Sequence, residues 1–165
     1  MTIEVPGLDG IYPLSVASDE QLRGFDCGKL SLNIWLEQRA RNNELSGGSR
    51  TFILVAKDGS VAGYYSLANH CLAHEGTRAV LRRNMPDPIP AILLGRLAVS
   101  KNFQGLGIGR SLLRHAIENA RRASEITAAA IFLTEPIDEA ASRFYLACGF
   151  ARVGNSLPFL GIRLH

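Results

Sequence analysis

The sequence has 165 residues, 47% of them apolar and 20% charged, with a formal net charge of +3 at pH 7, and this composition excludes a wholly disordered chain. The length fits one domain over residues 1–165, which is the organisation we expect. No apolar run approaches the roughly 20 residues that cross a bilayer, and the start of the chain carries acidic residues where a signal peptide carries basic ones, so we expect a cytoplasmic protein without a membrane segment.

The first half of the chain predicts one helix followed by a β-hairpin. Apolar residues recur at roughly helical spacing over residues 29–44, and the Ser46-Gly47-Gly48 segment cannot continue a helix. Residues 51–56 form a β-branched and aromatic run, and residues 61–67 resume extended character. The Asp58-Gly59 pair between these two runs is typical of a hairpin turn.

The second half predicts alternating strands and helices after a surface loop. A glycine and three prolines interrupt residues 72–90, which indicates a loop with little regular structure. The remaining elements are an apolar strand at residues 91–99, an amphipathic helix at 109–122, a buried parallel strand at 128–133, a short helix at 137–148 and a final strand at 159–164. The Gly95-Arg96 pair inside the first of these strands indicates a bulge or a close backbone approach. Together these elements predict a mixed α/β fold.

The three cysteines, Cys27, Cys71 and Cys148, predict neither a disulfide framework nor a zinc site, because their number is odd and none forms a CxxC pair. We expect reduced thiols packed in the core. The residues His70, Cys71, His74 and Glu75 are close in sequence, but a metal site would need further well-placed ligands. We therefore expect no metal.

Basic residues concentrate in the middle of the chain. Residues 76–122 contain nine basic and two acidic side chains, and 15 of the 18 basic residues in the protein are arginines. The planar guanidinium suits bidentate contact with phosphate. A solvated basic face and a polyanionic partner are both consistent with this distribution.

Three alternate glycines, Gly105, Gly107 and Gly109, join the predicted strand to the predicted helix. Such a turn can direct several backbone N–H groups and the helix dipole at one point, which favours a phosphate or pyrophosphate, although a simple tight connection stays open. A P-loop is excluded because Arg110-Ser111 replaces its Lys-Ser/Thr pair. A dinucleotide-binding fold is excluded because no acid lies about 20 residues further on.

The turn resembles the acetyl-CoA signature of the GNAT superfamily of N-acetyltransferases, Gln/Arg-x-x-Gly-x-Gly/Ala, which is complete here as Gln104-x-x-Gly107-x-Gly109. The resemblance implies a mostly antiparallel twisted sheet flanked by helices, with a splayed parallel strand pair at the cofactor site. It also implies acetyl-CoA as co-substrate, with pantetheine along the strand and pyrophosphate on the turn. The implied cofactor-binding residues are Leu97, Ala98, Val99, Gln104, Gly105, Leu106, Gly107, Ile108, Gly109 and Arg110.

The late helix resembles the same family through Ala141-x-x-Phe144-Tyr145-x-x-x-Gly149-Phe150, and the resemblance implies Tyr145 as the general acid. By spacing alone Tyr145 would be a core aromatic, but the glycine turn favours the catalytic interpretation. A phenol can protonate a departing thiolate when both groups lie in a dry site. No dedicated base is required for an α-amine, because its pKa of about 7.7 to 8.0 leaves part of it neutral.

Several blocks are similar to the GNAT toxins of bacterial type II toxin–antitoxin modules: Phe25-Asp26-Cys27-Gly28 and residues 63–67, 81–90 and 94–99. This resemblance implies acetylation of the amino acid on charged tRNA, which blocks translation, and a ribbon-helix-helix antitoxin as partner. We assign Arg39, Arg41, Arg82, Arg83 and Arg96 to tRNA binding. The segment Thr134-Glu135-Pro136-Ile137 departs from the toxin pattern, which leaves the substrate preference open.

Two other functions stay open on the sequence. One is a GNAT enzyme that acetylates a small amine or a protein N-terminus. The other is a CoA-binding interaction module without turnover. The sequence also leaves open which tRNA is used and whether the chain forms a homodimer.

Overall fold

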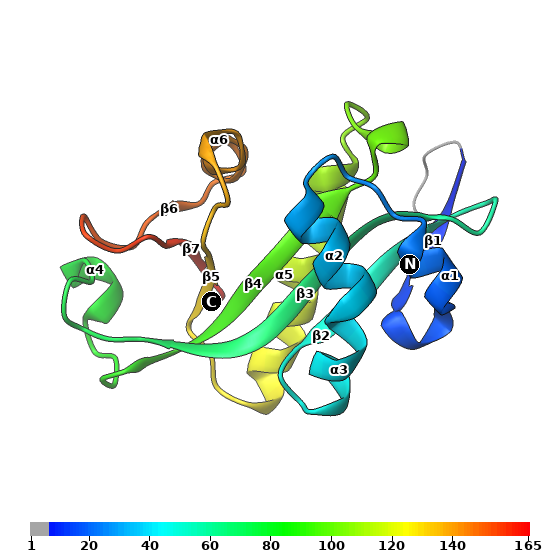
Figure 1. Ribbon diagram of the computed structural model, residues 1–165. Helices are drawn as coiled ribbons and strands as arrows, with labels where there is room; N and C mark the ends of the chain where they lie inside the picture. Colours follow the sequence, from blue (N-terminus) through cyan, green and yellow to red (C-terminus); the bar gives the residue numbers. More distant parts are fainter. Residues whose placement is uncertain (1–6) are drawn as a thin grey trace. The chain divides into compact units, whose positions relative to one another are not determined.

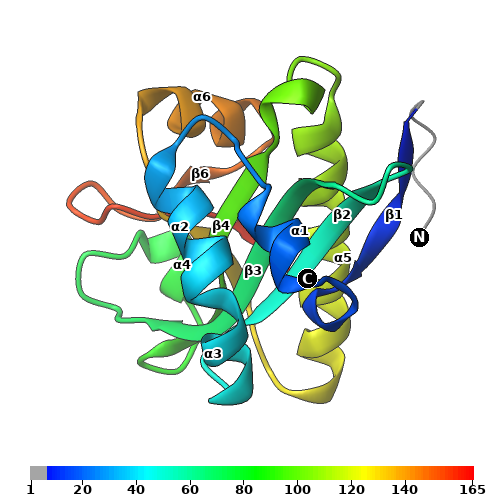
Figure 2. The ribbon, with the colours of Figure 1, turned by 45° about the vertical axis from the view of Figure 1, so that its right-hand side comes forward.

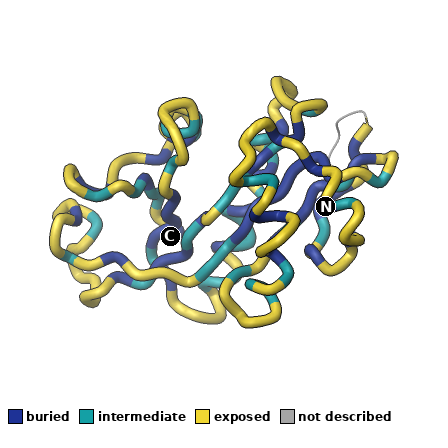
Figure 3. The backbone as a smooth tube through the Cα atoms, in the orientation of Figure 1, coloured by how far each residue is buried: buried dark blue, intermediate teal, exposed yellow. Residues whose placement is uncertain are grey.

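A computed structural model describes residues 7–165 and contains both helices and strands (Figure 1). The described chain divides into two compact units. The first unit comprises the residues up to Leu67 together with Arg96–Ala116, and the second comprises Ala68–Gly95 together with Ile117–His165. Each unit has its own cluster of buried apolar side chains, and Figure 3 shows buried segments along the strands of both.

The first unit contains the predicted β-hairpin, which the structure confirms. Strand β2 (Arg50–Ala56) pairs antiparallel with β3 (Val61–Leu72), with Phe52 opposite Tyr65. Gly59 in the turn has φ +87°, a conformation that glycine adopts without strain. Strand β1 (Leu8–Pro13) adds to the other edge of β2, and the sequence analysis had no prediction for it.

Helices of the first unit differ from the prediction at one point. The helix expected over residues 29–44 is two helices, α2 (Leu30–Gln38) and α3 (Ala40–Leu45), because Arg39 has φ −119°. Few apolar residues follow Leu36, so packing does not require one continuous helix there. The unit also contains η1 (Leu14–Val16), α1 (Asp19–Arg23), η2 (Lys101–Phe103) and the first part of α5 (Ile108–Ile126).

Two adjacent tyrosines of β3 anchor helices on opposite faces of the first unit's strands. Tyr64 stacks on Trp35 of α2 at 6.0 Å between ring centroids, and its hydroxyl donates to the carbonyl of Leu32 at 2.8 Å. Tyr65 makes a 2.7 Å hydrogen bond with Nδ1 of His115 in α5. Because successive strand residues alternate between faces, α2 and the first half of α5 lie on opposite sides of β3 (Figures 1 and 2).

Gly63 marks a close approach between β3 and α5. A Cβ atom at position 63 would lie 2.8 Å from Cδ1 of Leu112 and 2.9 Å from the carbonyl oxygen of Ala98. Both distances are shorter than van der Waals contact, so only glycine fits at this position without displacing its neighbours.

The second unit contains the parallel strand pair. Strand β4 (Ile89–Val99) pairs in parallel with β5 (Ile131–Thr134), from Ala91 opposite Ile131 to Leu94 opposite Thr134. Strand β7 (Leu160–Arg163) pairs antiparallel with both β5 and the two-residue β6 (Ala151–Arg152). The predicted mixed fold with a parallel pair is therefore confirmed.

Helices of the second unit agree broadly with the prediction. Helix α6 (Glu139–Ala147) matches the short helix expected at 137–148, and α5 extends a few residues beyond the predicted end. The loop expected over residues 72–90 contains one helical turn, α4 (Ala79–Arg82), and its final residues begin β4. None of the described helices is long and apolar enough to cross a membrane.

The cysteine prediction is correct for one residue and wrong for another. All three thiols are free; Cys27 is buried and Cys148 is half-buried. Cys71 is exposed, because β3 extends beyond the predicted end at residue 67 and presents residues 69–71 to solvent.

Candidate functional site

The glycine turn of the first unit leads directly into helix α5. Gly105 and Gly107 both have φ +79°, and a Cβ atom at either position would meet no atom within 4 Å. The first helical hydrogen bond runs from the N–H of Ser111 to the carbonyl of Gly107 at 3.3 Å, so the N–H groups of residues 108–110 precede it. The N–H groups of a first helical turn have no acceptor within the helix. The turn is therefore suited to an anion such as pyrophosphate.

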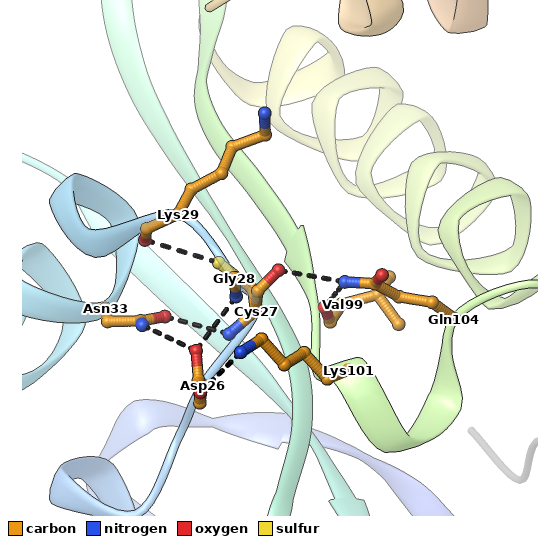
Figure 4. Close-up of polar contacts among 8 residues, drawn as sticks. All are labelled: Asp26, Cys27, Gly28, Lys29, Asn33, Val99, Lys101 and Gln104. Atoms are coloured by element: carbon orange, nitrogen blue, oxygen red, sulfur yellow. Dashed lines mark hydrogen bonds and ion pairs between the residues drawn. The ribbon is translucent and has the colours of Figure 1, made fainter.

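Gln104 fastens the start of this turn to two other segments (Figure 4). Its side-chain amide nitrogen donates to the carbonyl of Val99 at the end of β4 and to the carbonyl of Cys27, both at 2.9 Å. Both protons of the Gln104 amide are used in this way. The first residue of the signature therefore has a positioning role in the structure.

Asp26, the neighbour of Cys27 in the sequence, makes further contacts in the same place with Asn33 and Lys101. Asp26 accepts hydrogen bonds from the N–H of Gly28 and from Nδ2 of Asn33, both at 2.9 Å, and pairs with Nζ of Lys101 at 3.2 Å. These contacts hold the pKa of the Asp26 carboxyl below its usual value, and the hydrogen bond from Gly28 has the largest effect. The N–H of Lys101 also donates to the backbone carbonyl of Asp26.

The strand residues predicted to contact pantetheine precede the turn. Ala98 is buried, whereas Leu97 and Val99 are half-buried. Beyond them, the N–H of Ser100 donates to the carbonyl of Ala62 in β3 at 2.8 Å, which fixes the end of β4. The recorded pairing of β4 with β5 ends at Leu94, five residues before β4 ends.

Tyr145 lies on α6 in the second unit and is 6% exposed. The Asp138 side chain caps this helix by accepting from the N–H of Ala141 at 2.8 Å. The Tyr145 ring packs against Phe150, with 5.4 Å between ring centroids. Burial raises the pKa of Tyr145 to about 12, and the Thr134 side chain acts in the opposite direction. Tyr145 is therefore protonated at neutral pH.

Thr134 is a buried hydroxyl residue that the sequence analysis did not single out. It is 2% exposed, and its hydroxyl donates to the carbonyl of Leu94 at 3.2 Å. The available signal was a hydroxyl residue at the end of an apolar strand, followed by a helix that carries a tyrosine.

The five arginines predicted to bind tRNA differ in their environments. Arg39, Arg82 and Arg83 are exposed. Arg41 is held by a 2.8 Å contact of its Nε with Asp19 and by a hydrogen bond to the carbonyl of Ala17. The guanidinium carbon of Arg96 lies 4.1 Å from the centre of the Trp35 ring, and burial lowers the pKa of Arg96. Only the first three arginines present their charge freely to a ligand.

The histidines near residue 70 have other contacts in the second unit. Nε2 of His74 makes a 2.9 Å hydrogen bond with the carbonyl of Pro86, and the His70 ring packs on Phe159. Across residues 7–165, no group of three His, Cys, Asp or Glu side chains gathers as a metal site.

Comparison with known proteins assigns the chain to a family. Residues 48–152 match the family described as "Acetyltransferase (GNAT) domain". The chain belongs to the GNAT acetyltransferases. The resemblance that the sequence analysis based on Gln104-x-x-Gly107-x-Gly109 is therefore confirmed, and so is the predicted enzyme class.

Individual GNAT relatives cover most of the chain. A tRNA-acetylating toxin of Mycobacterium tuberculosis (strain ATCC 25618 / H37Rv) is 38% identical over 84% of this chain and 82% of its own length. The structure of AtaT complexed with acetyl-methionyl-tRNAfMet has a TM-score of 0.84 and 28% identity, covering 93% of each chain. A mutant AtaT toxin bound to the C-terminus of the antitoxin AtaR and acetyl-CoA has a TM-score of 0.75 and 29% identity, covering 93% of this chain and 92% of that one.

Proposed function

We propose that this GNAT chain is a toxin that transfers the acetyl group of acetyl-CoA to the α-amine of the amino acid on charged tRNA and thereby inhibits translation. The observation that carries the proposal is the turn geometry at the start of α5, where Gly105 and Gly107 are left-handed and the first helical hydrogen bond begins at Ser111. The 38% identity with a tRNA-acetylating toxin supports the choice of aminoacyl-tRNA as acceptor. We propose that both units together form one GNAT domain, because the family match includes residues of each.

Acetyl-CoA fits the residues present at the turn. The space beside Gly105 and Gly107 is open, and a side chain at either position would occupy it. In this proposal the N–H groups from Gln104 to Arg110 hold the pyrophosphate, and the backbone of Leu97, Ala98 and Val99 pairs with pantetheine. Acetyl-CoA supplies the activated acetyl thioester.

Tyr145 is the proposed general acid of the transfer. When the amine nitrogen bonds to the acetyl carbon and the carbon–sulfur bond breaks, the nitrogen loses a proton to solvent water and the leaving sulfur takes one from Tyr145, which water later reprotonates. At its ordinary pKa the α-amine is partly neutral, so it needs no dedicated base. Tyr145 keeps its proton at neutral pH because burial raises its pKa to about 12. The same dry environment makes a thiolate more basic, which offsets the weaker acidity of the buried phenol.

Exposed arginines are the proposed tRNA contacts. Arg39, Arg82 and Arg83 are exposed and carry charge that can neutralise phosphates. Arg41 and Arg96 belong to the proposed set with a smaller role, since Asp19 and Trp35 already hold them.

An antitoxin is the proposed partner, by analogy with the AtaT toxin bound to the C-terminus of AtaR. We propose a ribbon-helix-helix protein whose disordered acidic tail covers exposed arginines, among them Arg82, Arg83, Arg110 and Arg114. Because charged tRNA is used in translation in the cytoplasm, we propose that the enzyme acts there.

The test of the proposed function is acetyl transfer to bulk charged tRNA from radiolabelled acetyl-CoA. We expect label in the tRNA fraction that mild alkaline hydrolysis releases as N-acetyl amino acid, and no label on uncharged tRNA. Tyr145→Phe should lower turnover about 100-fold without weakening acetyl-CoA binding. Label that enters only free amines or protein N-termini would favour the small-amine enzyme, and acetyl-CoA binding without any transfer would favour the interaction module.

A further inference from the structure

Residues 26–28 form a short segment that is bonded both to the start of the glycine turn and to helix α2 (Figure 4). On the side of the turn, two consecutive backbone carbonyls of the segment accept hydrogen bonds. The carbonyl of Asp26 accepts from the N–H of Lys101, and the carbonyl of Cys27 accepts from the side chain of Gln104, both at 2.9 Å. The segment therefore supports the residues that lead into the turn.

One side chain of α2, that of Asn33, holds the same two residues from the other side. Its Oδ1 accepts from the N–H of Cys27, and its Nδ2 donates to Oδ1 of Asp26, both at 2.9 Å. A backbone N–H only donates and a carboxylate only accepts, so each end of the Asn33 amide has the partner that it requires. The two bonds together fix the direction in which the peptide group of Cys27 points.

Helix α2 gives this side chain a fixed base. Trp35 and Leu36 follow Asn33 in the helix and are 8% and 0% exposed. Trp35 also stacks on Tyr64 of β3. The core of the first unit therefore sets the position of Asn33, and a group held on such an element is placed more precisely than a group on a loop.

We propose that Asn33 is a positioning residue for acetyl-CoA binding, because it holds the Cys27 carbonyl where Gln104 binds it at the start of the turn. The inference rests on the proposed binding of acetyl-CoA at this turn. The recorded side-chain hydrogen bonds of Asn33 go to residues 26–27 and not to the turn, so its effect on the cofactor has to pass through these residues. Backbone N–H groups bind an anion more strongly when they are already oriented, since no ordering cost remains on binding.

The first test is Asn33→Leu, which keeps the approximate size of the side chain and removes both hydrogen bonds. Calorimetry should show a loss of acetyl-CoA affinity of about 3-fold to 10-fold, roughly the value of one neutral hydrogen bond. At saturating acetyl-CoA, kcat with bulk charged tRNA should not change. An acetyl-CoA affinity equal to that of the wild type would overturn the inference.

Asn43→Leu is the matched control for this variant. Asn43 is also half-buried, and its Nδ2 donates to the carbonyl of Arg39 at 3.0 Å, at a place without contact to residues 26–28. The control should leave acetyl-CoA affinity unchanged. Equal losses in both variants would show a general loss of structure and overturn the inference.

A double-mutant cycle with Gln104→Met tests the route of the effect. In the Gln104→Met background the Cys27 carbonyl has lost its bond to the turn, so Asn33→Leu should lower acetyl-CoA affinity by less than about 2-fold. An equal loss in both backgrounds would overturn the inference. If Asn33→Leu does not fold, Asn33→Asp is used in the same cycle, because it keeps the acceptor for Cys27 and loses the donor. A wild-type protein that does not bind acetyl-CoA would instead refute the proposed function, independently of Asn33.

Discussion

Gly107 has a left-handed backbone and open space beside it, and a substitution would strain the first and fill the second. Gly107→Glu places a negative side chain where the turn would hold pyrophosphate. We expect acetyl-CoA affinity to fall at least about 100-fold, as two charge-assisted hydrogen bonds are lost and repulsion is added. Isothermal calorimetry with acetyl-CoA measures this change.

Gly47 provides the matched control for that substitution. Its φ is +78°, and a Cβ atom there would also meet nothing within 4 Å. Gly47→Glu therefore carries the same backbone strain, about 1–2 kcal/mol, without touching the turn. Equal losses of acetyl-CoA affinity in both variants would show that strain, and not the anion site, is responsible.

Gln104 connects elements that are far apart in the sequence. Gln104→Met keeps the length of the side chain and removes both hydrogen bonds, to Cys27 and to Val99. We expect a loss of about 1–2 kcal/mol in the free energy of unfolding, and weaker acetyl-CoA binding because the turn is held less firmly. Thermal denaturation and calorimetry measure the two effects. Gln38→Met, at an exposed position at the end of α2, is the control and should change neither.

The elements show how far the sequence could predict the fold. Helix α5 was predictable because Leu112, Leu113 and Ala116 recur at helical spacing, and all three are buried. Strand β6 was not, because its two residues are exposed and carry no apolar pattern. The break at Arg39 depends on backbone geometry that side-chain spacing does not encode.

The candidate site was predictable where it follows a local motif. The turn from Gln104 to Gly109 is contiguous, so its residue types indicate its chemistry directly. The bond from Gln104 to Cys27 joins residues 77 positions apart, and the bond from Thr134 to Leu94 depends on strand register. Both contacts arise from tertiary packing, which one sequence alone does not determine.

At the scale of the whole molecule, the proposed acceptor is a polyanion, so activity should depend on salt. Arg82→Glu/Arg83→Glu removes two exposed cations from the end of α4. We expect the KM for charged tRNA to rise and the slope of log KM against log salt to decrease by roughly 1.4 to 1.8, as two phosphate contacts are lost. Acetyl-CoA affinity should not change.

The control for this prediction is Arg121→Glu/Arg122→Glu, which makes the same charge change at two adjacent exposed arginines of α5. Steady-state kinetics at several salt concentrations compares the two variants. If the slope decreases equally in both variants, the net positive charge of the protein attracts tRNA, and Arg82 and Arg83 make no specific phosphate contacts. An unchanged slope in Arg82→Glu/Arg83→Glu would favour the small-amine enzyme.

If the chain is a toxin, as proposed, the contact at Gly63 has a genetic consequence. Any side chain at position 63 would collide with Leu112 or the Ala98 carbonyl, although no substrate contact is proposed there. Every missense change of a glycine codon introduces such a side chain. Cultures that survive forced expression should therefore accumulate escape mutations at codon 63. A high frequency of such mutations would indicate that the close packing of β3 against α5 tolerates no side chain at position 63.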